Sequence, residues 1–134
     1  SPGALQPLFG FDSVEEIFAA LARAESHDGR NWAHEQLEVL KTKSPQTMKV
    51  ALRQLRDGAK AASFADVMRM EYRIACRVVH RHDFLEGVRA VIIDKDNAPR
   101  WEPATVEGVT PDIVEAIFAP LPADQEWSPL PGLA

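Results

Sequence analysis

Between two distant prolines, from Ser44 to Pro99, the sequence reads SPQTMKVALRQLRDGAKAASFADVMRMEYRIACRVVHRHDFLEGVRAVIIDKDNAP. Proline interrupts helix interiors and is favoured only at the first helical position, so the residues between Pro45 and Pro99 leave room for long helices. Apolar side chains recur there every three or four positions, which is typical of one helical face. Ser44 and Ser63 indicate helix starts, and Gly58 indicates a helix end. The centre of the chain is therefore predicted to be helical.

The residues on both sides of this centre predict further helices between irregular ends. The capping box Ser13-Val14-Glu15-Glu16 starts a first helix that His27-Asp28-Gly29 ends, and Thr110-Pro111 starts the last one. The predicted helices cover 13 to about 26, about 31–42, 45–59, 63–82, 83–93 and 111–121, with 94–110 as a loop. The chain is thus predicted to be one all-α array of about six helices over 13–121, between an irregular segment 1–12 and a Pro-rich tail 122–134.

The apolar spacing also predicts which side chains point inward. These positions are Val14, Ile17, Phe18, Leu21, Trp32, Ala33, Leu37, Leu40, Met48, Ala51, Leu52, Leu55, Phe64, Val67, Met68, Ala75, Val78, Val79, Phe84, Leu85, Val88, Val91, Ile92, Val114, Ile117, Phe118 and Leu121. The best strand candidate, Val91-Ile92-Ile93, is short, so it does not change the all-α prediction.

Length and composition restrict the class of protein. The 134 residues are 46% hydrophobic and 26% charged, which is average for globular domains and excludes a disordered, collagen-like or membrane-spanning chain. A chain of this length buries one ordinary core. The single cysteine, Cys76, excludes an internal disulfide and suits a reducing intracellular compartment.

The charge is distributed unevenly along the chain. Residues 41–100 hold 13 Lys/Arg and 7 Asp/Glu, a net charge of +6, whereas the other residues hold 2 and 13, a net charge of −11, and the sum is −5. A basic centre could attract a phosphate-bearing ligand or nucleic acid. The alternative is that the basic and acidic segments neutralise one another in the fold.

Four arginines, Arg69, Arg73, Arg77 and Arg81, recur every four residues on the predicted helix 63–82. Such a stripe could bind phosphates, but it is more often a solvated face or a set of aliphatic stems that covers apolar surface. Neither helix-turn-helix spacing nor interleaved aromatic residues supports nucleic-acid binding, so no nucleic-acid partner is expected.

Three short groups of residues could form a metal or catalytic site, and each also has a simpler structural interpretation. Cys76 and His80 could hold a metal or form a thiol–imidazole pair, but no second ligand pair accompanies them, and Cys76 fits a small buried residue. His82-Asp83 could form an acid–base dyad, but adjacent helical residues point apart, and Asp83 serves better as a helix cap. Asp94-Lys95-Asp96 could hold a divalent metal or form a solvated turn. With no glycine-rich phosphate loop, nucleophile elbow or metal-ligand cluster, no catalytic residue, metal site or cofactor is predicted.

Several stretches resemble one known family. They are Ser44-Pro45-Gln46-Thr47-Met48-Lys49-Val50, Leu52-Arg53-Gln54-Leu55, Met70-Glu71-Tyr72-Arg73, His82-Asp83-Phe84-Leu85-Glu86-Gly87-Val88-Arg89-Ala90-Val91-Ile92-Ile93-Asp94-Lys95-Asp96, Pro99-Arg100-Trp101 and Pro103-Ala104. Together they are similar to the C-terminal region of the 3-hydroxyisobutyryl-CoA hydrolase family, a branch of the crotonase (enoyl-CoA hydratase/isomerase) superfamily. The likeness runs from about Phe9 to Leu121.

The resemblance implies a fold and an activity for a larger parent protein. This chain would be the all-α, C-terminal helical region of a crotonase-type enzyme whose β/α core is missing from this chain. The parent would hydrolyse the thioester of 3-hydroxyisobutyryl-CoA in valine breakdown. Because the family's oxyanion hole and carboxylates lie in the core, no catalytic residue is carried over, and the chain alone is expected to be inactive. The helices would cover the acyl-CoA pocket, contact the missing core and support a homo-oligomer.

The resemblance also implies two candidate contacts to coenzyme A. In hydratase relatives an aromatic residue and a lysine after the Glu-Gly element approach the CoA adenine and phosphates. Val91 stands at the place of the aromatic residue and Asp94 near that of the lysine, so Lys95 and Arg89 are the candidates, with ordinary helix surface as the alternative.

Two other functions stay open at this point. The chain could belong to an enoyl-CoA hydratase or isomerase, which needs the same missing core. It could also be a free-standing helical interaction module without catalysis. The implied location of the hydrolase is the cytoplasm in a bacterium and the mitochondrial matrix in a eukaryote, without a membrane partner.

Overall fold

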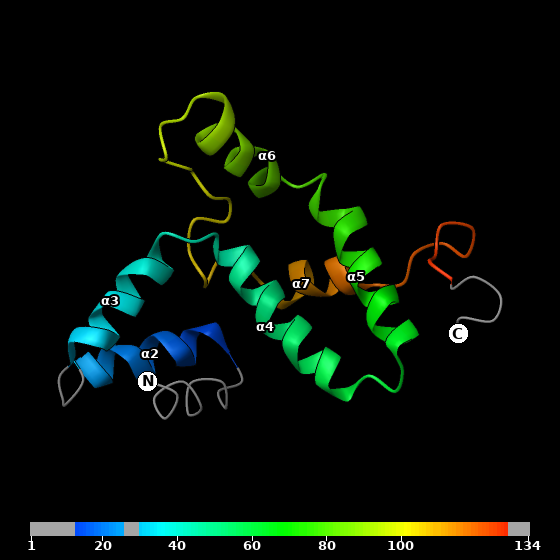
Figure 1. Ribbon diagram of the computed structural model, residues 1–134, viewed down its shortest axis with the longest axis horizontal. Helices are drawn as coiled ribbons and strands as arrows, with labels where there is room; N and C mark the ends of the chain where they lie inside the picture. The colour runs from blue at the N-terminus through cyan, green and yellow to red at the C-terminus, as the bar shows by residue number, and fades with distance from the viewer. Residues whose placement is uncertain (1–12, 26–29, 129–134) are drawn as a thin grey trace.

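The computed structural model describes residues 13–25 and 30–128. The expected irregular segment 1–12, the predicted turn at 27–29 and the last part of the Pro-rich tail lie outside the described residues. The described part contains six α-helices, one π-helix and no strand, which confirms the all-α prediction (Figure 1). The elements are α2 (Val14–Glu25), α3 (Arg30–Lys41), α4 (Pro45–Lys60), α5 (Phe64–Val78), α6 (His82–Val88), the π-helix η1 (Arg89–Ile93) and α7 (Pro111–Phe118).

Serine side chains start three of these helices as their sequences predict. The hydroxyl of Ser13 accepts the N–H of Glu16 at 3.1 Å at the start of α2. Ser44 caps α4 by accepting the N–H of Thr47 at 3.2 Å, and Ser63 caps α5 in the same way at 3.2 Å. Each bond satisfies a backbone donor that the first helical turn leaves without an intrahelical partner, so these helix starts are encoded locally.

The helix α4 lies at the centre of the fold and joins two groups of helices (Figure 1). Its residue Leu52 packs with Val14 of α2 and with Val106, while Val50 packs in a separate cluster with α5 and α7. The two outer clusters are Leu21, Ala33 and Leu37 between α2 and α3, and Val50, Ile74, Ile117 and Phe118 between α4, α5 and α7. No described helix is both long and apolar enough to cross a bilayer.

The predicted helix 63–82 is shorter in the structure, because α5 ends at Val78 and α6 begins at His82. Between them, Arg81 adopts an extended backbone with φ −93° and ψ 157°, which breaks the helical path. Five side chains predicted to point inward in this region are also exposed, namely Ala51, Leu55 at 60%, Phe64 at 75%, Ala75 and Val79 at 40%. Apolar spacing identifies a helical face, but whether another element covers that face depends on tertiary packing.

The predicted helix 83–93 is in fact the pair α6 and η1, which we call the α6–η1 arm (His82–Ile93). The arm stands away from the other helices (Figure 1). Its apolar residues were predicted to point inward, and this prediction is wrong for Phe84, Leu85, Val91 and Ile92. Their exposed fractions are 46, 61, 60 and 64%.

Candidate functional site

Arg89, the first residue of η1, is the centre of an ion-pair cluster. Its Nε and Nη2 contact the two carboxylate oxygens of Glu86 at 2.8 and 2.7 Å, and its Nη1 contacts Asp94 and Asp96 at 2.9 and 2.7 Å. The hydrogen bonds from Arg89, and then from the backbone of Arg100, lower the pKa of Glu86 to about 2. The guanidinium of this candidate CoA contact is thus surrounded by acceptors of its own chain, with which a phosphate would compete.

Lys95, the other candidate, lies in the turn directly after η1 and has a left-handed φ of 55°. Asn97, with φ 51°, donates its N–H back to the carbonyl of Ala90 at 2.9 Å and so closes this turn. Within the described ranges, no hydrogen bond or ion pair engages the Lys95 ammonium, whereas the flanking Asp94 and Asp96 are held by Arg89. The turn therefore presents Lys95 to solvent.

A cavity of about 360 Å³ lies beside the Arg89 cluster. Its lining residues are Glu86, Arg89, Asp96, Ala98 and Arg100. The wall combines two carboxylates with two guanidinium groups, so it can offer both donors and acceptors to a polar ligand. Arg89 borders this cavity and Lys95 does not, and their contact with CoA stays a prediction.

A group that the sequence did not reveal lies where the arm joins the rest of the fold. The buried polar side chains of the described residues are Ser44, Gln46 and Asp83, with exposed fractions of 5, 2 and 5%. The hydroxyl of Ser44 donates to one carboxylate oxygen of Asp83, and Arg81 donates to the amide oxygen of Gln46 at 2.6 Å. We call the three buried side chains Ser44, Gln46 and Asp83 the buried joint. Sequence inspection misses it because the bonded residues are 39 and 35 positions apart.

The segment after the arm is held to α6 by the side chains of its first and second turns. The second carboxylate oxygen of Asp83 accepts the N–H of Glu102 at 2.8 Å, and Glu86 accepts the N–H of Arg100 at 2.7 Å. The His82 ring bonds the Arg100 carbonyl through Nε2 at 2.8 Å. The predicted role of Asp83 as a helix cap is wrong, because α6 has no side-chain cap and the carboxylate is used by Ser44 and Glu102 instead.

His82 and Asp83 also do not share the geometry of an acid–base dyad. The His82 ring faces the Arg100 carbonyl and the carboxylate of Glu102, with Nδ1 3.6 Å from Glu102 Oε2. The backbone bond to Arg100 and the nearby carboxylates raise the pKa of His82 above its ordinary value. The Asp83 carboxylate instead accepts from Ser44 in the buried joint, so the two side chains point apart, as expected for adjacent residues of a helix.

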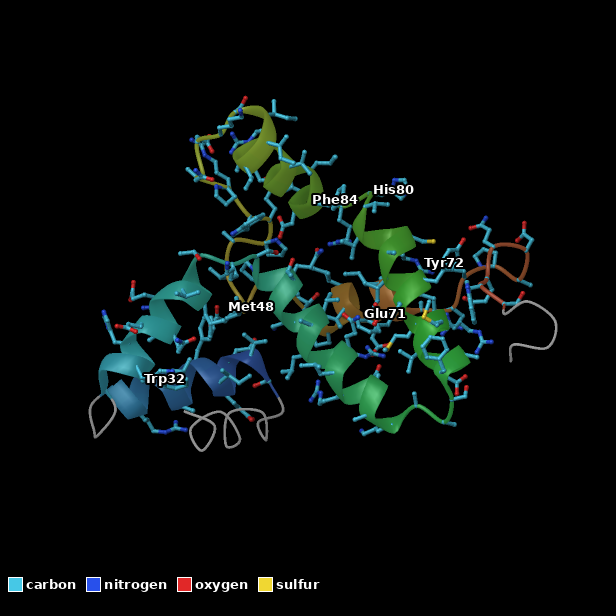
Figure 2. All side chains as sticks on the ribbon, in the orientation of Figure 1. Trp32, Met48, Glu71, Tyr72, His80 and Phe84 are labelled. Atoms are coloured by element: carbon cyan, nitrogen blue, oxygen red, sulfur yellow. The ribbon has the colours of Figure 1, made fainter. Side chains whose placement is uncertain are left out.

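Cys76 and His80 line a second cavity of about 390 Å³, between α5, α7 and the segment after α7. The hydrogen bond with the Cys76 thiol raises the pKa of the exposed Tyr72 hydroxyl (Tyr72 and His80 are labelled in Figure 2). In the part of the chain that the structure describes, no group of three His, Cys, Asp or Glu side chains could hold a metal ion.

The arginine stripe on α5 is used within the fold. Arg73 forms a bidentate ion pair with Glu126 at 2.7 to 3.0 Å, and Arg69 pairs with Asp66 at 3.1 Å. Arg77 donates to the carbonyls of Ile117, Ala119 and Pro120, at 3.1, 2.6 and 3.2 Å. These contacts support the structural interpretation of the stripe rather than a phosphate site.

A third cavity, of about 610 Å³, lies between the start of α2, one face of α4 and the start of α7. Its lining residues are Ser13, Val14, Glu15, Lys49, Leu52, Arg53, Arg56, Glu107, Val109, Thr110, Pro111, Val114 and Glu115. On its wall, Lys49 pairs with Glu15 at 2.6 Å and Arg53 pairs with Glu115. No pattern in the sequence predicts this cavity, because its walls come from three distant segments.

The described geometry thus defines a helical domain with a projecting, partly apolar arm. The chain belongs to the enoyl-CoA hydratase/isomerase family, whose sequence model matches residues 3–118. This finding confirms the predicted membership of the crotonase superfamily.

Among curated proteins the chain is similar to mitochondrial 3-hydroxyisobutyryl-CoA hydrolases, as its motifs predict. It is 45% identical to that of Gallus gallus over 117 residues, which cover 87% of this chain and 29% of the relative. It is 37% identical to that of Dictyostelium discoideum over 124 residues, which cover 92% of this chain and 32% of the relative. The chain therefore spans about 30% of the length of the curated relatives it matches.

Two solved structures share the fold. A carnitinyl-CoA dehydratase from Mycobacterium thermoresistibile aligns with a TM-score of 0.74 and 38% identity, over 92% of this chain and 35% of its own. An enoyl-CoA hydratase from Rhodobacter sphaeroides 2.4.1 aligns with a TM-score of 0.81 and 35% identity, over 95% of this chain and 36% of its own.

Proposed function

We propose that this chain is the C-terminal helical part of an acyl-CoA thioester hydrolase that acts on 3-hydroxyisobutyryl-CoA. In this role the helices cover the acyl-CoA pocket of a catalytic core, with Lys95 and Arg89 as contacts to CoA, and aid assembly of a homo-oligomer. The observation that carries the proposal is the 45% identity over 117 residues to the hydrolase of Gallus gallus. The implied location is the mitochondrial matrix in a eukaryote and the cytoplasm in a bacterium.

The exposed arm supports the covering and assembly part of the proposal. Leu85, Ile92 and Ile93 have exposed fractions of 61, 64 and 68% and lie on one short projection. Exposed apolar residues that gather in this way mark surfaces that contact another protein surface. A catalytic core or a neighbouring subunit would bury them.

A chimera tests the proposed reaction. The matched segment of the Gallus gallus hydrolase is replaced by this chain, and release of the CoA thiol from 3-hydroxyisobutyryl-CoA is measured. We expect turnover within about tenfold of the parent enzyme, because the replaced helices would contribute no group that touches the thioester. The same enzyme with the segment deleted is the control, and this chain alone is expected to give no turnover. A folded chimera with no hydrolysis would contradict the proposal.

An enoyl-CoA hydratase or isomerase is the second candidate, and the TM-score of 0.81 to the Rhodobacter sphaeroides hydratase favours it. The corresponding chimera in that hydratase is assayed for hydration of an enoyl-CoA. Full activity there, with an inactive hydrolase chimera, would assign the chain to this candidate.

The third candidate, a free-standing interaction module, predicts a smaller native polypeptide than the first two candidates do. The intact mass of the protein isolated from its source cell decides this point. A mass near 14.9 kDa would favour the module, and a mass about three times larger, as in the matched relatives, would exclude it.

A further inference from the structure

We propose that the α6–η1 arm is a hinged unit, and that Asp83 is a positioning residue that sets the angle of the arm on the helical body through the buried joint. The proposal concerns the chain itself and goes beyond the reaction proposed above. It rests on the position of the buried polar side chains in the described fold.

The arm is closed on itself and is not part of the described core. None of the three apolar clusters contains a residue of α6 or η1. Ala90 of the arm is completely buried. In the turn that follows η1, the N–H of Asp94 bonds back to the carbonyl of Arg89 at 2.8 Å and the N–H of Asn97 to that of Ala90. The arm therefore has its own hydrogen bonds and ion pairs, which allow it to move as one body.

The attachment of the arm is polar on both of the chain segments that connect it. On the incoming side, Arg81 binds Gln46, and Asp83 binds the hydroxyl of Ser44. On the outgoing side, the N–H of Glu102 binds Asp83, and the indole of Trp101 donates to the carbonyl of Thr42 at 3.0 Å. Asp83 is the one residue in this set that bonds both the α4 start and the outgoing segment.

Because the joint is held by hydrogen bonds, it fixes the angle between the arm and the helical body. Apolar contacts are non-directional, whereas hydrogen bonds depend strongly on distance and angle. If Asp83 is removed, the hydroxyl of Ser44 loses its acceptor in a buried place and the N–H of Glu102 loses its acceptor in a part-buried one, so water must enter to satisfy them. Opening the joint therefore releases the orientation of the arm without disturbing its internal bonds.

The angle between the arm and the helical body determines where the exposed side chains at the end of the arm lie. Lys95 lies in the turn after η1, and Ile92 lies on the exposed surface of η1. If the proposed function holds, the same joint determines where these side chains meet CoA and the core, and this consequence alone rests on that function.

Distance measurement between two spin labels tests the hinge in the full 134-residue chain. In a Cys76→Ala background, labels are placed at Ala59→Cys on α4 and Ile92→Cys on the arm, both at exposed positions. We expect one narrow distance distribution for the parent and a shifted, broader one for Asp83→Ala. Asp83→Asn should restore the narrow distribution, because its carbonyl still accepts from Glu102 and its amide still reaches Ser44.

Amide hydrogen exchange separates pivoting from local melting. In Asp83→Ala the amide of Glu102 should exchange at least about tenfold faster. The amides of Asp94 and Asn97, which bond back to Arg89 and Ala90 of the arm, should change by less than about twofold. Asp66→Ala is the matched control, since it removes a carboxylate that pairs with Arg69 on the surface of α5. It should change neither measurement.

Two results would overturn the proposal. One is an unchanged distance distribution in Asp83→Ala. The other is faster exchange of the Asp94 and Asn97 amides together with that of Glu102, which would mean that the arm melts instead of pivoting. If Asp83→Ala loses helix content in circular dichroism, Ser44→Ala is used instead, which removes the donor of the same bond together with the side-chain cap of α4. Ser63→Ala, which removes only the equivalent cap of α5, is its control, and the same two results decide.

Discussion

At the level of single residues, His82 is a side chain whose charge is controlled by its surroundings. The hydrogen bond to the Arg100 carbonyl is the largest cause of its raised pKa, and the carboxylates of Glu102, Asp83 and Glu86 add to it. A raised pKa means that protonated His82 contributes stability that is fully present below pH 6.5 and is lost as the pH rises through the raised value. The sign follows because the folded chain holds this proton more tightly than the unfolded chain.

We therefore expect His82→Gln to flatten the pH dependence of stability on the alkaline side of pH 6.5. Urea unfolding between about pH 5.5 and 8.5 measures this change for the parent and the variant. Glu102→Gln is the companion variant, because it removes one nearby charge and should lower the pKa of His82 in an NMR titration. An imidazole that titrates at or below 6.5 in the parent would contradict the prediction.

At the level of helices, α5 holds the end of α7 through one guanidinium. Arg77 contacts the carbonyl of Ile117 in the last turn of α7 and those of Ala119 and Pro120 just after it. A cation at a helix C-terminus also interacts favourably with the helix dipole. We expect Arg77→Ala to lower the free energy of unfolding by about 1–2 kcal/mol, because three acceptors lose a charged donor.

Urea unfolding of two further variants checks the Arg77 prediction. Arg69→Ala, on the same stripe, removes only a surface ion pair to Asp66 and should cost less than about 0.5 kcal/mol. Arg77→Lys should restore little of the lost stability, since an ammonium cannot span the three carbonyls as a guanidinium fork does. If Arg69→Ala and Arg77→Ala lowered the free energy of unfolding equally, the contact of the Arg77 guanidinium with three carbonyls would contribute no more than a surface ion pair.

The same comparison of helices shows what the sequence could predict. The starts of α2, α4 and α5 were predictable because Ser13, Ser44 and Ser63 act within one helical turn. A boundary between α5 and α6 was predictable, since the predicted start at Asp83 lies one residue from the observed start of α6 at His82. The end of α5 at Val78 was not predictable, because no proline or glycine marks it, and Arg81 with its extended backbone binds the distant Gln46.

The candidate site was predictable only in part, for a similar reason. Family motifs selected Arg89 and Lys95, but they did not indicate that Arg89 is surrounded by three carboxylates. Asp83 was interpreted from its neighbours in sequence as a cap, whereas its partners Ser44 and Glu102 are brought to it by the fold. Local chemistry can be derived from a sequence, while a buried polar joint needs the tertiary arrangement.

At the level of the whole molecule, ion pairs join the basic centre of the chain to its acidic flanks. Three cations from the basic centre pair with carboxylates of the acidic flanks, and each pair connects separate elements. These pairs are Lys49–Glu15, Arg53–Glu115 and Arg73–Glu126. The basic centre therefore ties the ends of the domain to α4 and α5, which leaves the apolar arm as the distinctive surface of the described chain.

The exposed arm predicts that the isolated chain self-associates. Leu85 and Ile92 are more than half exposed on the arm, and burying them against a second copy would remove apolar area from water. We expect a mass above that of the monomer in light scattering after gel filtration at high concentration. The double variant Leu85→Glu and Ile92→Glu should return the chain to a monomer, because a charge in this contact costs more than the contact gains.

The control for this prediction is a second pair of exposed apolar residues away from the arm. Val39 on α3 and Leu55 on α4 are 50 and 60% exposed, so Val39→Glu with Leu55→Glu makes the same chemical change in a place that lies outside the arm. If any exposed apolar residue sufficed, this variant would also become monomeric. Association that survives it but not the arm variant locates the contact on α6 and η1, whereas a parent chain that is strictly monomeric at every concentration would contradict the prediction.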